Sequence, residues 1–301
     1  ASDNVDVFAI PIVTYTAPAD LCIDAGVQTS LGGATPAGGI YSGSGVTDDG
    51  DGMTYSFDPA TAGVGIHIMT YTFTDGNGCT SSASDNVEVF VIPTVTYTAP
   101  ADLCIDAGVQ SGLGGGTPTL GVYSGTGVTY DANGITYSFD PAAAGVGVHT
   151  ITYEFSDING CLGRATDDVE VFALPTVTFI APADLCIDAG VQTGLGGGTS
   201  PGGVYSGTGV TDDGNGMTYS FDPAASGVGV HTLMYTLGIA GCTDATSDDV
   251  EVFALPVVTF TALTDLCIDA GVQSGLGGAT PTGGIYSGSG VTDDGDGMTY
   301  S

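Results

Sequence analysis

Positive charge is almost absent from this 301-residue chain. Its one cation is Arg164, it has no lysine, and 34 acidic side chains give a formal net charge of −33 at pH 7. Such a charge repels nucleic acids and anionic membranes, so we expect neither as a partner. Without lysine, the chain also cannot form the phosphate-binding loop of P-loop nucleotidases.

Other signatures of catalysis or membrane insertion are also missing. No stretch approaches the roughly 20 apolar residues of a membrane span, so we predict no insertion by this segment. Neither a GxSxG elbow nor an HExxH motif is present. The three histidines, His67, His149 and His231, follow AGVG at equivalent positions, which favours a structural role. We therefore predict that the chain is not an enzyme.

Repetition is the dominant feature that is present. The segment DLCIDAGVQ occurs four times, and its cysteines are spaced by 82, 82 and 81 residues. Prolines near the joins divide the chain into the last strand of a preceding repeat, three full repeats and the front of a further one: 1–11, 12–93, 94–175, 176–256 and 257–301. Since both ends fall inside a repeat, we expect the chain to be a window of a longer tandem array.

Each repeat has the pattern of an all-β domain. Within residues 94–175, turn residues separate the apolar stretches TVTYTAP, DLCIDA, GVYSGTGV, ITYSFD, HTITYEF and DDVEVF. In HTITYEF, His149, Ile151, Tyr153 and Phe155 alternate with polar residues, as in a half-buried strand. No segment shows helical periodicity. The pattern predicts an immunoglobulin-like β-sandwich per repeat, and the short proline-containing joins predict stiff, end-to-end stringing.

The cysteines recur as regularly as the strands. Each full repeat has two, separated by 57, 57 and 56 residues: Cys22 and Cys79, Cys104 and Cys161, Cys186 and Cys242. We predict one disulfide within each repeat, stabilising it by roughly 4 kcal/mol, in preference to a metal-binding pair. Cys267 lacks such a partner because its repeat is incomplete. Disulfides predict an extracytoplasmic setting.

An acidic loop recurs in four copies: TDDGDG at 47–52, TYDANG at 129–134, TDDGNG at 211–216 and TDDGDG at 292–297. Asp-Gly and Asn-Gly favour a β-hairpin turn. The alternative is a calcium site, because calcium prefers carboxylate and carbonyl oxygens. An EF-hand spacing is absent and Tyr130 removes one ligand in the second copy. The candidate ligands are Asp48, Asp49, Asp51, Asp212, Asp213, Asn215, Asp293, Asp294 and Asp296.

The segment GGVYSGTGVTDDGNGMTYSFDPAASGVGVHTLMYT, followed by a GC turn and DDVEVF, resembles a known repeat type. It is similar to the tandem immunoglobulin-like repeats of very large Bacteroidota surface proteins, whose arrays commonly end in type IX secretion or gliding-motility-associated domains. The resemblance covers the whole chain, although the third repeat has AGC where the first two have NGC. It implies an extracellular or cell-surface protein that serves adhesion or display.

Two functions remain open at this point. The first is a structural extracellular filament or stalk, whose partners are further copies of the same repeat in the same chain or alongside it. The alternative is a calcium-dependent array that binds surface glycans or proteins. A binding array should retain affinity as an isolated fragment, whereas a stalk fragment should be inert.

Overall fold

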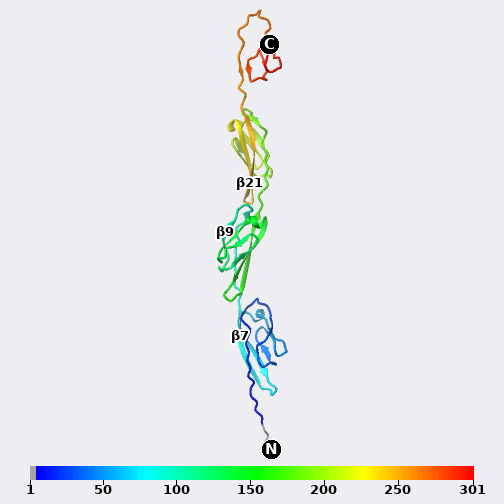
Figure 1. Ribbon diagram of the computed structural model, residues 1–301, viewed down its shortest axis with the longest axis vertical. Coiled ribbons are helices and arrows are strands. Elements are labelled where there is room, and N and C mark those ends of the chain that lie inside the picture. Colours follow the sequence, from blue (N-terminus) through cyan, green and yellow to red (C-terminus); the bar gives the residue numbers. More distant parts are fainter. Residues whose placement is uncertain (1–4) are drawn as a thin grey trace. The chain divides into compact units, whose positions relative to one another are not determined.

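The computed structural model describes residues 5–301, and it contains two compact units, Ala1–Ala173 and Leu174–Ser301. The first unit holds two repeats, with strand β7 in the first and β9 in the second, and the other unit holds the third repeat and residues 257–301 (Figure 1). Across residues 5–301, no helix is both long and apolar enough to cross a membrane.

The first repeat folds as two packed sheets with seven strands in all. They are β1 (Leu21–Cys22), β2 (Gln28–Leu31), β3 (Ile40–Ser42), β4 (Val46–Asp48), β5 (Tyr55–Phe57), β6 (Gly65–Thr74) and β7 (Thr80–Phe90). One sheet has the order β1-β7-β6-β3 and the other β2-β5-β4. Strand β1 runs parallel to β7, and all other pairs are antiparallel. This is the arrangement of an immunoglobulin-like sandwich.

The same topology recurs in the other two full repeats. The second contains β8 (Leu103–Cys104), β9 (Gln110–Leu113), β10 (Val122–Ser124), β11 (Val128–Tyr130), β12 (Tyr137–Phe139), β13 (Gly147–Ser156) and β14 (Leu162–Phe172). The third contains β15 (Leu185–Cys186), β16 (Gln192–Leu195), β17 (Val204–Ser206), β18 (Val210–Asp212), β19 (Tyr219–Phe221), β20 (Gly229–Ile239) and β21 (Cys242–Phe253). Residues 257–301 add β22 (Thr259–Phe260) and β23 (Ala279–Thr280). The predicted tandem of immunoglobulin-like units is confirmed.

The first predicted strand of each repeat is mostly not a strand. In the second repeat, TVTYTAP makes a single bridge, between Thr96 and Thr117, and the regular strand β9 follows later. Strand β9 was not predicted, because its QSGL sequence has little apolar alternation. The first segment is held by side chains instead of by a continuous ladder, as described below.

The expectation of no helix is wrong. A one-turn helix follows the fifth strand of each full repeat, β5, β12 or β19. The three helices are α1 (Pro59–Ala62), α2 (Pro141–Ala144) and α3 (Pro223–Ser226). Asp140 caps α2, accepting hydrogen bonds from the N–H groups of Ala142 and Ala143, and proline occupies the first turn. An N-cap Asp before Pro is a standard helix start. Four residues are too few to show a helical period, so only the FDPA letters carried this signal.

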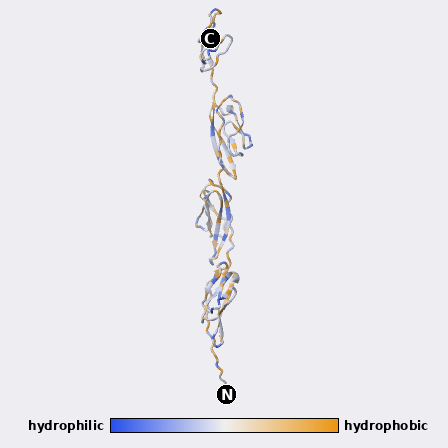
Figure 2. Ribbon diagram, turned by 90° about the vertical axis from the view of Figure 1, so that its right-hand side faces the viewer, coloured by the Kyte–Doolittle hydropathy of each residue, from blue (hydrophilic) through white to orange (hydrophobic). Residues whose placement is uncertain are grey.

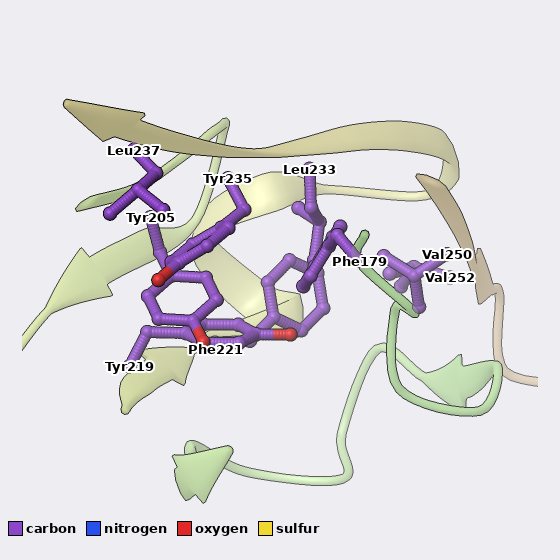
Figure 3. Close-up of a cluster of buried hydrophobic side chains, with 9 residues drawn as sticks. All are labelled: Phe179, Tyr205, Tyr219, Phe221, Leu233, Tyr235, Leu237, Val250 and Val252. Carbon is purple, nitrogen blue, oxygen red and sulfur yellow. The ribbon is translucent and has the colours of Figure 1, made fainter. Parts of the chain in front are cut away.

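The core of each repeat lies between the two sheets and is rich in tyrosine. Along β13, Ile151 and Tyr153 are buried while Thr150 is exposed, which confirms the predicted alternation. Apolar and hydrophilic stretches interleave along the ribbon accordingly (Figure 2). In the third repeat, the cluster contains Phe179, Tyr205, Tyr219, Phe221, Leu233, Tyr235, Leu237, Val250 and Val252 (Figure 3).

Each core contains a central tyrosine, which is Tyr235 in the third repeat and Tyr153 in the second. Close packing around its ring explains part of the glycine content. The hydroxyl of Tyr235 donates to the carbonyl of Ser200 at 2.7 Å and accepts from the N–H of Gly203 at 3.0 Å. A Cβ on Gly203 would lie 2.4 Å from the ring of Tyr235, so only glycine fits there. The ring is thus fixed at both its face and its hydroxyl.

Candidate functional site

The acidic loop of the first repeat forms the turn of the hairpin β4–β5, in which Asp48 lies opposite Tyr55. The two carboxylate oxygens of Asp48 accept from different backbone groups, the N–H of Gly50 at 2.9 Å and the N–H of Tyr41 at 2.7 Å. One oxygen therefore shapes the turn, and the other connects it to β3. This acid is committed to local structure.

The other two acids of the loop hold its far side. Asp51 accepts from the N–H groups of Met53 and Thr54, both at 2.7 Å. The hydroxyl of Thr54 approaches carboxylate oxygens of Asp49, at 2.7 Å, and of Asp51, at 2.9 Å. Hydrogen bonds from the backbone of Thr54 and Met53 lower the pKa of Asp51. All these contacts are local and exposed.

The other copies show that charge is not needed at the first and the last acidic position of the loop. Asn215 replaces the last acid in the third repeat, and its side-chain oxygen accepts from the N–H groups of Met217 and Thr218, both at 2.8 Å. Tyr130 replaces the first acid in the second repeat, and its hydroxyl accepts from the N–H of Gly134 at 2.9 Å. A neutral amide or hydroxyl therefore suffices at these two positions, while Asp131 and Asp213 still accept hydrogen bonds from the threonine hydroxyls of their loops.

The predicted calcium ligands do not gather into a larger cluster. In the part of the chain from residue 5 onward, no group of three or more His, Cys, Asp or Glu side chains is placed to hold a metal ion. The geometry supports the hairpin turn, and calcium stays a prediction for Asp48, Asp49, Asp51, Asp212, Asp213, Asn215, Asp293, Asp294 and Asp296.

The three histidines make one and the same contact. The Nε2 of His67 lies 2.7 Å from the carbonyl oxygen of Gly63, the residue that caps the C-terminus of helix α1. His149 and His231 repeat this contact with Gly145 and Gly227, also at 2.7 Å. Each ring is half-buried beside a helix end. The contact fits the predicted structural role.

Two acids per repeat have a role that the sequence analysis did not identify. In the first repeat, Asp85 of β7 accepts from the N–H of Ala17 at 3.0 Å, and Asp20 accepts from the N–H of Glu88 at 2.8 Å. The first segment is thereby docked onto the last strand by carboxylates in place of a ladder. Hydrogen bonds from the backbone of Ala17 and Asn86 lower the pKa of Asp85. The pattern recurs as Asp167 with Ala99 and Asp102 with Glu170, and as Asp248 with Ala181 and Asp184 with Glu251.

The disulfide is where the structure departs most from expectation. Cys22 of the first repeat bonds to Cys161 of the second, 139 residues away, with a Cα–Cα distance of 5.6 Å. Cys79, Cys186 and Cys267 have free thiols, and Cys104 and Cys242 are each in a disulfide. The predicted pairing within each repeat is therefore wrong: Cys22 does not bond Cys79, Cys104 does not bond Cys161, and Cys186 does not bond Cys242.

Strand geometry explains the correction. Cys22 ends β1 and lies opposite Phe90, at the end of β7, whereas Cys79 comes just before Thr80, at the start of β7. Eleven residues of strand span about 35 Å, while bridged cysteines have Cα atoms at most about 7 Å apart. The two cysteines of one repeat thus lie at opposite ends of the sandwich and cannot meet.

The tip of the next hairpin brings the true partner to Cys22. Cys161 follows the turn between β13 and β14, where Asp157 accepts from its N–H at 2.8 Å. Its side chain is fully buried. Beside it, a Cβ on Gly163 would lie 2.4 Å from the carbonyl oxygen of Pro93 and 2.5 Å from Val95, so this hairpin packs directly on the join. The disulfide therefore bridges the junction of the first two repeats.

No protein-family model and no curated protein matches the chain. Solved structures match its fold at low identity. A Ca²⁺-stabilised adhesin with which an Antarctic bacterium binds ice is 19% identical, with 85% of this chain and 78% of that chain covered and a TM-score of 0.35. A 1.5-MDa bacterial ice-binding adhesin is 16% identical, with 78% and 94% covered and a TM-score of 0.31.

The I-band fragment I67–I69 of titin also matches, at 9% identity, with 83% of this chain and 100% of that chain covered and a TM-score of 0.40. These likenesses are distant, and they concern the fold. By the strand topology of its repeats, the chain is an array of tandem immunoglobulin-like domains with disulfides.

Proposed function

We propose that this chain is a structural segment of an extracellular stalk or filament, whose repeats provide length and carry tension for adhesion or display and catalyse no reaction. One observation carries the proposal: the disulfide between Cys22 and Cys161 joins two successive repeats. A bond confined to one repeat would stabilise that domain alone. A bond across a junction stabilises the array.

The disulfide supplies a second covalent connection across the junction. The polypeptide itself crosses once, at Pro93, and the bond crosses beside it. A pull along the chain can pass from Cys22 directly to Cys161, so residues 23–160 are left out of the loaded path. Those residues include most of both sandwiches, whose hydrogen bonds and cores then need not resist the pull.

The chemistry of the surface fits an extracellular array. Disulfides persist in oxidising compartments outside the cytoplasm. The net charge of −33 makes neighbouring chains repel each other and remain soluble when crowded. Acids of the recurring loop and of the last strand accept hydrogen bonds from backbone groups of their own repeat, as Asp48 and Asp85 show. These features support a scaffold.

Single-molecule pulling on the oxidised 301-residue chain, held by tags at its ends, tests the proposal. The wild-type chain should keep residues 23–160 unextended. The double variant Cys22→Ser/Cys161→Ser should release additional contour on the order of 200 Å or more, because at least the first repeat becomes extensible. Cys79→Ser, which removes a free thiol, is the matched control and should behave like the wild type.

Equal extension of the wild-type chain and the double variant would show that the disulfide carries no load and would overturn the proposal. Tight calcium-dependent binding of the intact chain to a glycan array would also overturn it, in favour of a binding role. A chelator should leave the pulling traces of the wild-type chain unchanged.

A further inference from the structure

We infer that the bond between Cys22 and Cys161 is one step of a continuous pattern, in which the first cysteine of every repeat bonds to the second cysteine of the next repeat. Cys79, Cys186 and Cys267 are then half-bridges, and the partner of each is a cysteine in a further repeat of the same type. Every junction of the array is crossed once by the chain and once by a disulfide.

Sequence equivalence is the first support. Cys104 and Cys186 stand in the same DLCIDAGVQ segment as Cys22, and Cys242 follows the turn of the equivalent hairpin, which is one residue shorter than the turn before Cys161. The segments fold alike, since β8 and β15 pair in parallel with the last strand of their repeats just as β1 does. Each first cysteine therefore lies at the end of the sandwich where the chain leaves it.

The state of the remaining cysteines is the second, independent support. The pattern assigns Cys104 to Cys242, and both are in disulfides. It places the partner of Cys79 in a repeat before residue 12 and the partners of Cys186 and Cys267 in repeats completed after residue 301. These three are the cysteines with free thiols. A pattern of bonds within repeats would instead have left only Cys267 free.

Each half-bridge is also accessible for bonding. Cys186 and Cys267 are exposed and Cys79 is half-buried, whereas Cys161 is fully buried once bonded. An incoming hairpin tip would therefore cover an exposed first cysteine, as the tip containing Cys161 does for Cys22. The partner that fits is therefore the second cysteine of another copy of this repeat, which follows a hairpin turn as Cys161 follows residues 157–160.

Bond formation requires an oxidant, and a thiol–disulfide oxidoreductase of the extracytoplasmic space is the class we assign. The thiolate of one cysteine attacks the oxidoreductase disulfide and forms a mixed disulfide. The thiolate of the second cysteine then attacks the sulfur of the first and expels the oxidoreductase. Two cysteine thiols lose two electrons and two protons, and the oxidoreductase leaves as a dithiol.

Disulfide mapping of the oxidised 301-residue chain tests the pattern directly. The DLCI letters around all four first cysteines are identical, so cleavage at Asp cannot tell these sites apart. Chymotryptic cleavage after Tyr and Phe gives a distinct peptide for each cysteine, such as 16–41 and 98–123 for Cys22 and Cys104. Free thiols are alkylated first to prevent exchange.

The expected map links Cys22 to Cys161 and Cys104 to Cys242, with alkyl groups on Cys79, Cys186 and Cys267. In the variant Cys104→Ser, Cys242 should become alkylated. A link from Cys104 to Cys161 or from Cys186 to Cys242, in either protein, would overturn the inference. Such a map would differ from a failure of the load-bearing role, which the pulling experiment measures separately.

A chain extended after Ser301 by a second copy of residues 221–256 tests the half-bridge. This addition completes the fourth repeat and provides a new second cysteine, the copy of Cys242. Cys186 should then lose its alkyl group and bond to the new cysteine. The same extension with serine in place of that cysteine should leave Cys186 alkylated. A bond from Cys267 to the new cysteine would overturn the inference.

Discussion

The second and third repeats share a close pair of tyrosine rings in their cores but differ in a hydrogen bond of that pair. In the second, the hydroxyls of Tyr97 and Tyr137 are hydrogen-bonded at 2.6 Å. In the third, Phe179 occupies the position of Tyr97, and the buried hydroxyl of Tyr219 has no hydrogen-bond partner among the described residues. A buried hydroxyl without a partner costs about 1–3 kcal/mol.

The ring geometry is nevertheless unchanged. Tyr123 and Tyr137 have centroids 4.5 Å apart at an interplanar angle of 29°, and Tyr205 and Tyr219 have centroids 4.5 Å apart at 28°. The shape and packing of the rings therefore set this core, and the hydroxyl pair adds stability to an arrangement that already exists. The comparison separates packing from hydrogen bonding within one fold.

Removal of the central ring should have the largest effect, and it should affect both repeats alike. Tyr153→Ala and Tyr235→Ala each leave a large cavity in a fully buried site, so we expect a loss of about 3–5 kcal/mol in the repeat concerned. Hydrogen exchange read by mass spectrometry resolves the repeats. Ile158→Ala, at a fully exposed hairpin tip, is the control and should change less than about 0.5 kcal/mol. Strongly unequal losses in the two repeats would contradict a shared packing core.

High pH should affect the second repeat more than the third. Burial raises the pKa of Tyr219 to about 12, and burial followed by the hydrogen bond with Tyr137 raises the pKa of Tyr97 further. A raised pKa gives stability that is complete below the unfolded value near 10 and is lost as the pH rises through the folded value. Ionisation of Tyr219 alone should lower the free energy of unfolding of the third repeat by about 2 kcal/mol by pH 12.

In the second repeat, burial also raises the pKa of Tyr137, the equivalent of Tyr219, and the ionisation of Tyr97 adds a further loss of stability, whereas Phe179 of the third repeat does not ionise. Hydrogen exchange measured from about pH 9 upward would show which of the two repeats opens first as the pH rises. The tyrosinate absorbance of the unfolded chain serves as the reference. Earlier opening of the third repeat would contradict the assigned cause.

Exchange of the residue that occupies the position of Tyr97 and Phe179 should have the smallest effect, with opposite signs in the two repeats. Phe179→Tyr gives the hydroxyl of Tyr219 a partner and should stabilise the third repeat by about 1 kcal/mol. Tyr97→Phe leaves the hydroxyl of Tyr137 without its partner and should destabilise the second repeat by about 1–2 kcal/mol. Tyr219→Phe serves as the control, because it removes the unpaired hydroxyl and should not destabilise. If both exchanges had the same sign, ring size and not the hydrogen bond would be responsible.

Much of the fold could be predicted from the amino-acid sequence. Alternation in HTITYEF placed Ile151 and Tyr153 inside, and repetition gave the number of domains. The docking of the first segment could not be read, because Asp85 and Ala17 are 68 residues apart and nothing local links them. For the acidic loop, the sequence allowed two predictions, a hairpin turn and a calcium site. The contacts of Asp48 and Asn215 support the turn.

The sequence by itself determined the repeat, its strand content and the presence of two equivalent cysteines in each complete copy. These features follow from local patterns, which each short segment carries with it. Only the tertiary structure decided which cysteines meet. The parallel pairing of β1 with β7 places Cys22 beside Phe90, a whole strand length from Cys79, and the next hairpin brings Cys161 within reach. Proximity in space, set by strand direction and length, determined the bond.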